Sequence, residues 1–329
     1  MEMSFRSAAS ILLACAVTCS AAPAKKRAQK PALPPRLNRS VLEEELPPGT
    51  RPEPGKRVDP RNFHQLAEGE LPLAARGAVV LDSYTGRTLY GKNAEEPQFP
   101  ASTTKIMTAL LVIEAGDLER EVEITDEDAR VGESSLNIRV GERYTRRQML
   151  YGLMLKSAND VAHSLGRDNA GSVGAFGLKM TLRARELGAT ATNFRNAHGL
   201  HDTQHFTTPH DLALIAWAAM QQPLFRQIVA TLEHPWVTSF SVHPLRNHNR
   251  LLTQFPGCIG VKTGYTYPAQ QVLASAALRD NREVIAVIMH SDKPGIWEDS
   301  KLLLTYGFDH PSGVATVGLP AQRRTASQP

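Results

Sequence analysis

The sequence predicts an α/β protein with a mainly antiparallel sheet, flanked by helices and interrupted by an inserted all-helical subdomain. Three observations support this fold class. Strand-like runs appear near residue 77, a long block with helical apolar spacing follows at about 118–234, and strand-like runs return after about residue 235. A helical block between two groups of strands is typical of one sheet that the chain leaves and later rejoins.

The first elements are a hairpin and a helix. Residues 77–82 form an apolar run, residues 83–86 have turn composition, and residues 87–90 can pair back as the second arm. Apolar residues then recur at helical spacing from Ile106, behind Pro100, and the pattern ends near Gly116. The chain therefore predicts a hairpin followed by a helix that begins at Ser102.

The remaining elements are predicted from the same two patterns, helical apolar spacing and strand-like apolar runs. Glycine-containing loops separate the helices of the block. Helices are expected over 146–156, 161–167, 173–187, 209–220 and 297–306, and strands over 236–242, 259–266, 272–278 and 283–289.

The N-terminus has the features of an export signal. Residues 1–24 combine Arg6, a short apolar run over 7–17 and the small residues Ala22-Pro23-Ala24 before Lys25, which is typical of a cleaved signal peptide. The apolar run is too short to span a membrane. The alternative is a lipoprotein signal, because residues 12–15 fit one in which Cys15 becomes lipidated. Both interpretations predict an exported protein in the periplasm or cell envelope.

The segments that flank the folded part have little capacity to build a core. Residues 25–60 hold eight prolines and many charges, which predicts a disordered tether. A folded domain is expected over 61–310, with the helical subdomain at about 118–234 inside it. Residues 311–329 are expected to be a second disordered tail with no membrane anchor.

The charge distribution argues against nucleic acid as a partner. The net charge of +4 arises from the ends of the chain, since residues 25–60 hold nine Lys and Arg against five Asp and Glu. Residues 61–320 carry about −2, so a basic folded face has little support. The three cysteines are Cys15, Cys19 and Cys258, and a chain cleaved near Ala24 would retain Cys258 alone.

The stretch Ser102-Thr103-Thr104-Lys105 carries the first candidate chemistry. Three residues separate Ser102 from Lys105, so both side chains lie on one helical face within reach of each other. A serine hydroxyl needs a base to become a nucleophile, and a lysine that burial keeps unprotonated can supply one. By itself the pattern also fits an ordinary capped helix.

Two further motifs follow in order. Ser157-Ala158-Asn159 lies between two predicted helices, where a loop can present a hydroxyl and an amide to a cleft. Lys262-Thr263-Gly264 lies in a predicted strand, where a glycine leaves room for a substrate against the strand edge. Each motif alone is weak, but the three together, in this order and at these elements, indicate an active site.

This set of motifs resembles the active-site-serine penicillin-binding proteins and serine β-lactamases. The stretches Leu81 to Gly86, Pro100 to Thr108, Thr192 to Leu200 and Gly260 to Thr266 are most similar to the D-alanyl-D-alanine carboxypeptidases, the low-molecular-mass penicillin-binding proteins. The resemblance covers about residues 74–309. It implies a serine β-lactamase/transpeptidase-like fold that removes the terminal D-alanine from peptidoglycan stem peptides and is inhibited by β-lactam antibiotics.

The resemblance also implies a role for each motif residue. Ser102 would be the nucleophile, Lys105 its base, and Ser157 a proton relay to the leaving amine. The substrate would be bound by Asn159 at its amide, by Thr263 at its carboxylate, and by the field of Lys262, which would also hold Ser157. The backbone N–H groups of Ser102 and Tyr265, next to Gly264, would form the oxyanion hole.

The sequence departs from the family pattern at three places. The family usually has Ala-Gly where this chain has Ala269-Gln270, and Gly-Gly where it has His290-Ser291. An arginine that helps to bind the substrate carboxylate is replaced by Ile296, with Lys293 the nearest cation in the sequence. These departures concern substrate affinity and leave the catalytic set intact.

Two other functions remain as rivals. A β-lactamase needs a base for fast deacylation, and the only glutamates between Asn159 and Lys262 are Glu186 and Glu233, neither in the expected context. A non-catalytic wall-binding protein would have lost Ser102, Lys105 or Ser157. The sequence leaves open whether the acyl group passes to water or to a second stem amine. It predicts no cofactor, and although four histidines cluster over 198–210, it favours a loop there over a metal site.

Overall fold

The structure is a computed structural model that describes residues 70–311. The predicted signal peptide, the tether at 25–60 and almost all of the predicted tail at 311–329 lie outside these residues. Among the described helices, none combines the length and the apolar character that crossing a bilayer requires.

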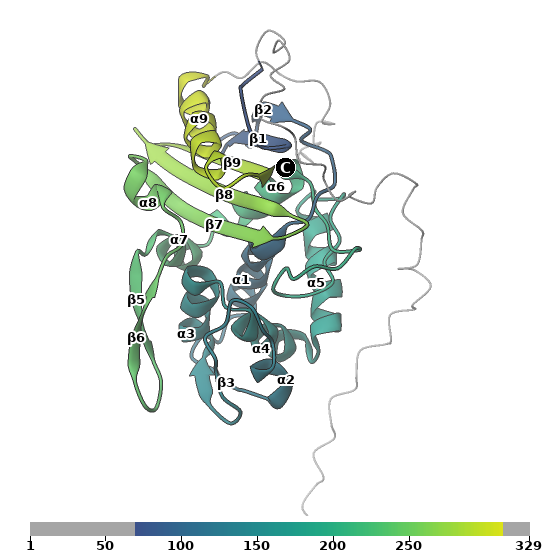
Figure 1. Ribbon diagram of the computed structural model, residues 1–329, viewed down its shortest axis with the longest axis vertical. Helices are drawn as coiled ribbons and strands as arrows, with labels where there is room; N and C mark the ends of the chain where they lie inside the picture. The colour runs from purple at the N-terminus through teal and green to yellow at the C-terminus, as the bar shows by residue number, and fades with distance from the viewer. Residues whose placement is uncertain (1–69, 312–329) are drawn as a thin grey trace, which may run out of the picture. The chain divides into compact units, whose positions relative to one another are not determined.

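A five-stranded sheet forms the centre of the described region (Figure 1). Its strand order is β2-β1-β9-β8-β7, and every neighbouring pair is antiparallel, as predicted. The strands are β1 (Gly77–Asp82), β2 (Thr88–Lys92), β7 (Cys258–Thr266), β8 (Gln270–Arg279) and β9 (Arg282–Ser291). Strand β7, which carries the Lys-Thr-Gly motif, is an edge strand and faces the helical block.

Helices cover both faces of the sheet. Along β1, Val79 and Leu81 join a core that contains α1 (Lys105–Glu114) and α6 (Pro209–Met220). The alternate residues Ala78 and Val80 join a second core under α9 (Gly295–Asp309), which lies across the opposite face in Figure 1. Side chains on a strand point alternately to the two faces, so one apolar run supplies both cores.

The helical block contains more than helices. Its helical elements are α2 (Asp126–Ala129), α3 (Arg146–Tyr151), the π-helical turn η3 (Gly152–Lys156), α4 (Asn159–Ala170), α5 (Val173–Glu186), α6 and α7 (Pro223–Ala230). The prediction of an all-helical insertion was wrong, because β3 (Glu121–Glu123) pairs with β4 (Arg143–Thr145). Strands of three residues are too short to leave an alternating pattern in the sequence.

One expected strand is a hairpin. The single strand predicted over 236–242 is replaced by β5 (Glu233–Val237) and β6 (Val242–Arg246), with Trp236 opposite His243. Each arm buries one residue, Trp236 and Leu245, so neither arm alternates strongly enough to be seen as a strand. This two-stranded ribbon runs down one side of the molecule in Figure 1. The short helix α8 (Leu251–Gln254) connects it to β7.

The other predicted elements are confirmed with shifted ends. The helix expected from Ser102 begins as a 3-10 turn, η2 (Ala101–Thr104), and continues as α1. The helix expected over 146–156 changes from α3 to η3 at Gly152, so that it ends at Ser157.

Candidate active site

Ser102 and Lys105 meet at the beginning of α1. Ser102 lies in the 3-10 turn, Lys105 is the first residue of the α-helix, and Lys105 Nζ is 3.0 Å from Ser102 Oγ. The three-residue spacing therefore brings the two groups together, as the sequence predicted.

Lys105 has a complete set of polar contacts. Its side chain is fully buried, and Nζ lies 2.8 Å from Asn159 Oδ1 and 2.7 Å from the His198 carbonyl oxygen. Burial, and secondarily the charge of Lys262, lower the pKa of Lys105 well below its ordinary value.

The neutral amine of Lys105 fits these contacts atom for atom. It has two N–H donors and one lone pair. Because Asn159 Oδ1 and the His198 carbonyl oxygen can only accept, they take both hydrogens. The lone pair is left to accept a hydrogen bond from the Ser102 hydroxyl, which is the arrangement a general base requires.

Two segments from distant parts of the chain hold Lys105 in place. Ser157 ends the π-helical turn in the left-handed conformation, with φ 64°, which leads directly into Asn159 at the start of α4. On the other side, Gly199 has φ +87°, and a Cβ at this position would lie 1.8 Å from the Ala101 carbonyl oxygen. Only glycine lets the 197–200 segment pack this closely against the Ser102 turn.

Asn159 contacts Lys105 directly, in addition to its predicted role of binding the substrate amide. In the structure its Oδ1 accepts from Lys105, its Nδ2 donates to the Gly132 carbonyl oxygen at 3.0 Å, and the side chain is 3% exposed. The geometry supports a role in orienting Lys105.

Strand β7 forms the opposite wall of the site. A Cβ at Gly264 would lie 2.9 Å from Ser102 N, so glycine allows the strand to touch the catalytic turn. Burial lowers the pKa of Lys262 to about 7, and its Nζ donates to the Thr263 carbonyl oxygen at 3.0 Å. The expected contact between Lys262 and Ser157 is not among the hydrogen bonds of residues 70–311.

A cavity of about 460 Å³ opens at this point. Five of the predicted residues line it together: Ser102, Ser157, Thr263, Gly264 and Tyr265. The other three, Lys105, Asn159 and Lys262, are buried behind its wall.

The cavity also contains residues that the sequence analysis missed. Arg250, at the start of α8, lines it with its guanidinium 5.6 Å from the centre of the Trp297 ring. Ile296 lines the same wall, whereas Lys293, the nearest cation to Ile296 in the sequence, is exposed and does not line the cavity. No local signal relates Arg250 to Ser102, because the two residues are distant in sequence.

Arg250 is the dominant charge of the cavity. Among its described lining residues there is no Asp or Glu. His248 is a second candidate cation, but desolvation and the nearby charges of Lys262 and Lys156 lower its pKa to about 4, so it is neutral at pH 7. Arg250 has no carboxylate partner among the described residues, and it gives the cavity an uncompensated positive charge.

The glycine departures coincide with left-handed backbone. Gln270 and His290 stand where the family usually has glycine, and they have φ of 54° and 55°. This region costs a residue with a side chain about 1–2 kcal/mol. Gln270 and His290 therefore hold a backbone conformation that glycine would adopt at lower cost.

The histidines of the 198–210 segment have structural partners. His205 Nδ1 accepts from Arg195 N at 3.1 Å, so Nε2 carries the hydrogen and donates to Thr104 Oγ1 at 2.8 Å. Burial lowers the pKa of His205 to about 3, consistent with a neutral ring. With both nitrogens used, His205 cannot bind a metal together with His201, four residues earlier in the chain.

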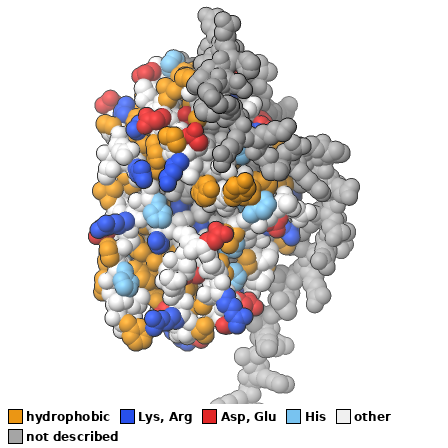
Figure 2. Space-filling view, viewed as in Figure 1, with side chains coloured by type: hydrophobic (Ala, Val, Ile, Leu, Met, Phe, Trp, Pro, Cys, Tyr) orange, Lys and Arg blue, Asp and Glu red, His pale blue; other side chains and the backbone are white. Residues whose placement is uncertain are grey.

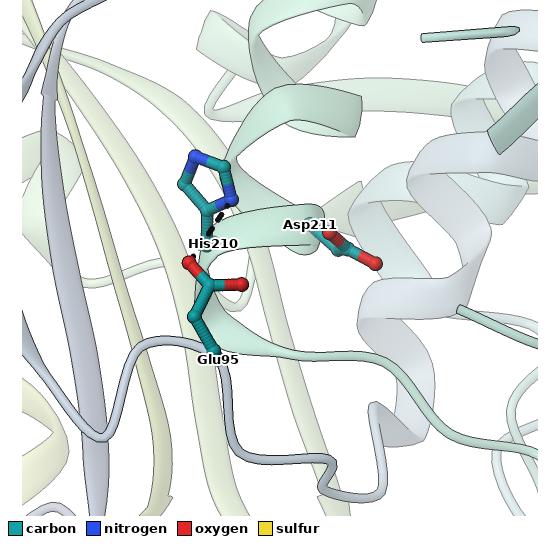
Figure 3. Close-up of side chains that lie close together, drawn as sticks. All are labelled: Glu95, His210 and Asp211. Carbon is teal, nitrogen blue, oxygen red and sulfur yellow. Dashed lines mark ion pairs between the residues drawn. The ribbon is translucent and has the colours of Figure 1, made fainter. Parts of the chain in front are cut away.

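A second cluster of potential metal ligands lies at the start of α6 (Figure 3). Ligand atoms of Glu95, His210 and Asp211 are within 4.8 Å of one another, and His210 Nδ1 is 3.4 Å from Glu95 Oε1. Asp211 Oδ2, however, accepts from Ala191 N and Thr192 Oγ1. These bonds explain the burial of Asp211, and we assign no metal to the cluster.

Known proteins resemble this chain in sequence and in fold. The model of the D-alanyl-D-alanine carboxypeptidase family matches residues 64–293. The carboxypeptidase DacF of Bacillus subtilis is 35% identical over 68% of this chain, which spans 59% of that relative. A D-alanyl-D-alanine carboxypeptidase of Streptomyces sp. strain K15 is 34% identical over 72% of this chain and 88% of its own length.

Solved structures of related proteins have a similar fold. The crystal structure of the Streptomyces K15 DD-transpeptidase matches 72% of this chain and 98% of its own, with a TM-score of 0.69 and 34% identity. A penicillin-binding protein homologue from Mycobacterium tuberculosis matches 76% and 98%, with a TM-score of 0.72 and 31% identity. This chain belongs to the D-alanyl-D-alanine carboxypeptidase family of serine peptidases.

Proposed function

We propose that this protein removes the terminal D-alanine from peptidoglycan stem peptides, with Ser102 as nucleophile and Lys105 as general base. One observation carries the proposal: the buried Lys105 Nζ lies within hydrogen-bond distance of Ser102 Oγ and of two fixed acceptors, so that in its neutral form it gives both hydrogens to those acceptors and accepts from the Ser102 hydroxyl. A base held in this way needs no rearrangement before it accepts the proton.

The first chemical step forms an ester. Ser102 Oγ attacks the carbonyl carbon between the last two residues, and its proton passes to Lys105 Nζ. The oxyanion is stabilised by the N–H groups of Ser102 and Tyr265 and by the positive end of α1. The intermediate then collapses, the C–N bond breaks, and the leaving amine receives a proton from Lys105 through the Ser157 hydroxyl.

The second step releases the product. Water attacks the ester carbonyl, one of its protons passes to Lys105, and the bond to Ser102 Oγ breaks as that oxygen recovers a proton. The enzyme returns to its starting state with D-alanine and a shortened peptide as products. No cofactor takes part in this scheme.

Arg250 supplies the recognition of the free C-terminus. A carboxypeptidase must bind a carboxylate next to the bond it cleaves, and Arg250 is the charged side chain that faces the cavity. Packing against Trp297 limits the motion of the guanidinium, so less entropy is lost when it pairs with a carboxylate. Thr263 adds a hydroxyl in the same cavity.

A β-lactam would enter the same cavity and acylate Ser102. The ester should persist, because the two glutamates considered for deacylation have other partners. Glu186 pairs with Arg183, Glu233 pairs with Arg246, and neither lines the cavity. This supports a penicillin-binding peptidase over a β-lactamase.

We also propose that the protein is exported and cleaved near Ala24, on the basis of the N-terminal sequence. Mass spectrometry of the mature N-terminus tests this. A diacylglyceryl-modified Cys15 would support the lipoprotein alternative instead.

The test of the activity is release of D-alanine from a stem pentapeptide by the purified protein, followed by mass spectrometry of the peptide product. The Ser102→Ala variant should release none. Ser172→Ala is the matched control, because it removes a serine hydroxyl that caps α5 away from the cavity. Release by Ser102→Ala at the rate of the control would refute the proposal.

A further inference from the structure

A buried carboxylate adjoins the catalytic residues in the sequence and has no cation as a partner. Asp160 follows Asn159 at the start of α4 and is 0% exposed. Figure 2 shows other Asp and Glu side chains (red) at the surface, several of them beside Lys or Arg (blue). Unlike Asp128 and Asp168, which pair with arginines, Asp160 takes part in no ion pair within residues 70–311. Burying a carboxylate in this way is costly unless hydrogen bonds satisfy it.

One loop supplies most of the donors to Asp160. Its Oδ2 accepts from the Ser135 hydroxyl at 2.6 Å and from the N–H groups of Leu136 at 3.0 Å and Ile138 at 3.3 Å. Its Oδ1 accepts from Val161 N at 2.9 Å, in the first turn of its own helix. All four partners donate, so they match a carboxylate, which can only accept.

The loop depends on these bonds for its position. Residues 132–139 form neither helix nor strand, and Asn137 has φ of 55°. Backbone N–H groups outside regular structure need other acceptors when they are buried. Because Asp160 is the acceptor for Leu136 and Ile138, it determines where this loop lies against α4.

The same loop holds the catalytic segment. Ser134 lines the catalytic cavity, and its carbonyl oxygen accepts from Asn159 N at 2.7 Å. The Gly132 carbonyl oxygen accepts from Asn159 Nδ2 at 3.0 Å. Asn159 Oδ1 in turn lies 2.8 Å from Lys105 Nζ. The loop that Asp160 fixes therefore holds the side chain that orients the Lys105 amine.

The charge of Asp160 acts on the same amine. Burial, and secondarily the charge of Lys262, lower the pKa of Lys105. Asp160 opposes both effects, as Glu133 does, because a nearby negative charge favours the protonated amine. His198 also faces Lys105, but burial lowers the pKa of its ring well below the ordinary value, so the ring is neutral. Loss of the Asp160 charge should therefore lower the pKa of Lys105.

We propose that Asp160 is a positioning residue for the acylation of Ser102, because its carboxylate fastens the 134–138 loop to α4 and thereby holds Asn159 and Lys105 in place beside the serine. The inference rests on the proposed function, since it concerns the base of that reaction. Asp160 makes no hydrogen bond to Ser102 or Lys105 among the described residues. It acts through the loop and through its charge.

Acylation by penicillin tests this role in Asp160→Asn, which keeps the size of the side chain and removes the charge. At saturating penicillin, acylation should slow about 10-fold or more. The concentration for half-maximal rate should change by less than about 2-fold, because Asp160 does not line the cavity. The ratio of the rate at pH 5.5 to the rate at pH 8.5 should rise about 3-fold, as expected if the pKa of Lys105 falls by about 0.5.

Two further variants separate position from charge and from stability. Ser135→Ala removes one donor to Asp160 and keeps the charge, so acylation should slow about 3-fold with an unchanged pH ratio. Asp168→Asn is the matched control, because this carboxylate is also buried on α4 but pairs with Arg146. It should acylate at the wild-type rate under conditions where thermal unfolding shows that it is folded.

Two results would overturn the inference. One is a wild-type rate of acylation in Asp160→Asn. The other is a slower rate in that variant whose pH ratio is unchanged, or which Asp168→Asn shows equally, because general loss of stability would have that effect. If Asp160→Asn does not fold, Ser135→Ala decides, and a wild-type rate in it overturns the inference. Ester formation at Ser102 in the wild-type protein is measured first, so failure of the proposed function is distinguished from failure of this inference.

Discussion

The catalytic cluster under β7 and the cavity wall that carries Arg250 use positive charge in opposite ways. Lys105 and Lys262 are fully buried, and burial lowers the pKa of both. Arg250 is exposed and has no carboxylate partner among the described residues. A buried lysine is suited to accepting a proton, whereas an exposed arginine keeps its charge and is suited to binding an anion.

This difference predicts the size of each mutational effect. Removing a buried group of the cluster removes the chemistry, because a nucleophile and its base act as a unit. Removing an exposed cation removes one charge-assisted contact, which is worth about 1.5–3 kcal/mol when it is made with an ion. The following experiments test the contrast.

The largest effect is expected for Ser102→Ala. Penicillin should form a stable ester with the wild-type protein at Ser102, and the variant should form none. The fold should persist within about 1 kcal/mol, because the variant loses one half-buried hydroxyl whose hydrogen bond is with Lys105 Nζ. Intact-protein mass spectrometry and thermal unfolding measure the two quantities. An adduct at another residue of the wild-type protein would contradict the assignment.

Lys105→Ala should slow penicillin acylation by a factor on the order of 10³ or more. In the wild-type protein the acylation rate should fall with decreasing pH as Lys105 becomes protonated, because the neutral amine is the active form. Stopped-flow acylation between pH 5 and 9 measures this. Lys179→Ala, which removes an exposed lysine paired with Asn169, is the matched control. Equal rates for the two variants would exclude Lys105 as the base.

Arg250→Gln should lower kcat/KM for peptides with a free terminal carboxylate by about 10- to 100-fold. The same variant should cleave the corresponding C-terminal amide as the wild-type protein does, because the amide has no charge to pair. Arg250→Lys should recover part of the loss. An equal loss for acid and amide would mean that Arg250 supports the cavity without binding the carboxylate.

Lys262 should make stability depend on pH. Its pKa is about 7 in the folded protein and near the ordinary 10.5 when unfolded, so the unfolded state binds more protons between these values. The free energy of unfolding should therefore rise from about pH 7 toward pH 10, with up to about 1.4 kcal/mol per pH unit from this lysine. Denaturant titrations of Lys262→Met should show a shallower rise. An unchanged slope would mean that Lys262 is not buried as a neutral amine.

The smallest expected effect is a difference in salt dependence between the two regions. Exposed charges are screened at high ionic strength, whereas a buried proton transfer is screened much less. Raising NaCl from 0.05 to 0.5 M should reduce kcat/KM for the peptide with a free terminal carboxylate by about 3-fold. The kcat/KM for the corresponding C-terminal amide, which has no charge to pair with Arg250, should change less. An equal response of both reactions would remove the distinction drawn here between the two regions.

The sequence alone was sufficient to predict the main sheet and the catalytic residues, because local patterns indicate both. Apolar runs bounded by turn residues predicted the five main strands, and the three-residue spacing of Ser102 and Lys105 predicted their contact. The strand pair β3–β4 and the β5–β6 hairpin were missed or merged, because short or exposed strands bury too few side chains to leave a pattern.

Tertiary structure alone decided the surroundings of that set. The His198 carbonyl oxygen is a backbone group, so no side-chain motif indicates that it fixes the Lys105 amine. Asn159 was assigned to the substrate by resemblance, and the structure adds that its Oδ1 contacts the Lys105 amine. Arg250 reaches the catalytic cavity because α8 packs against β7 and the start of α9 lines the same cavity, a long-range arrangement that local sequence does not encode. The sequence by itself therefore determined which groups can do the chemistry. Folding determined which of these groups are buried from solvent, which are charged and which line the substrate cavity. Burial and the distance to neighbouring charges set the pKa of each group, and with it the charge.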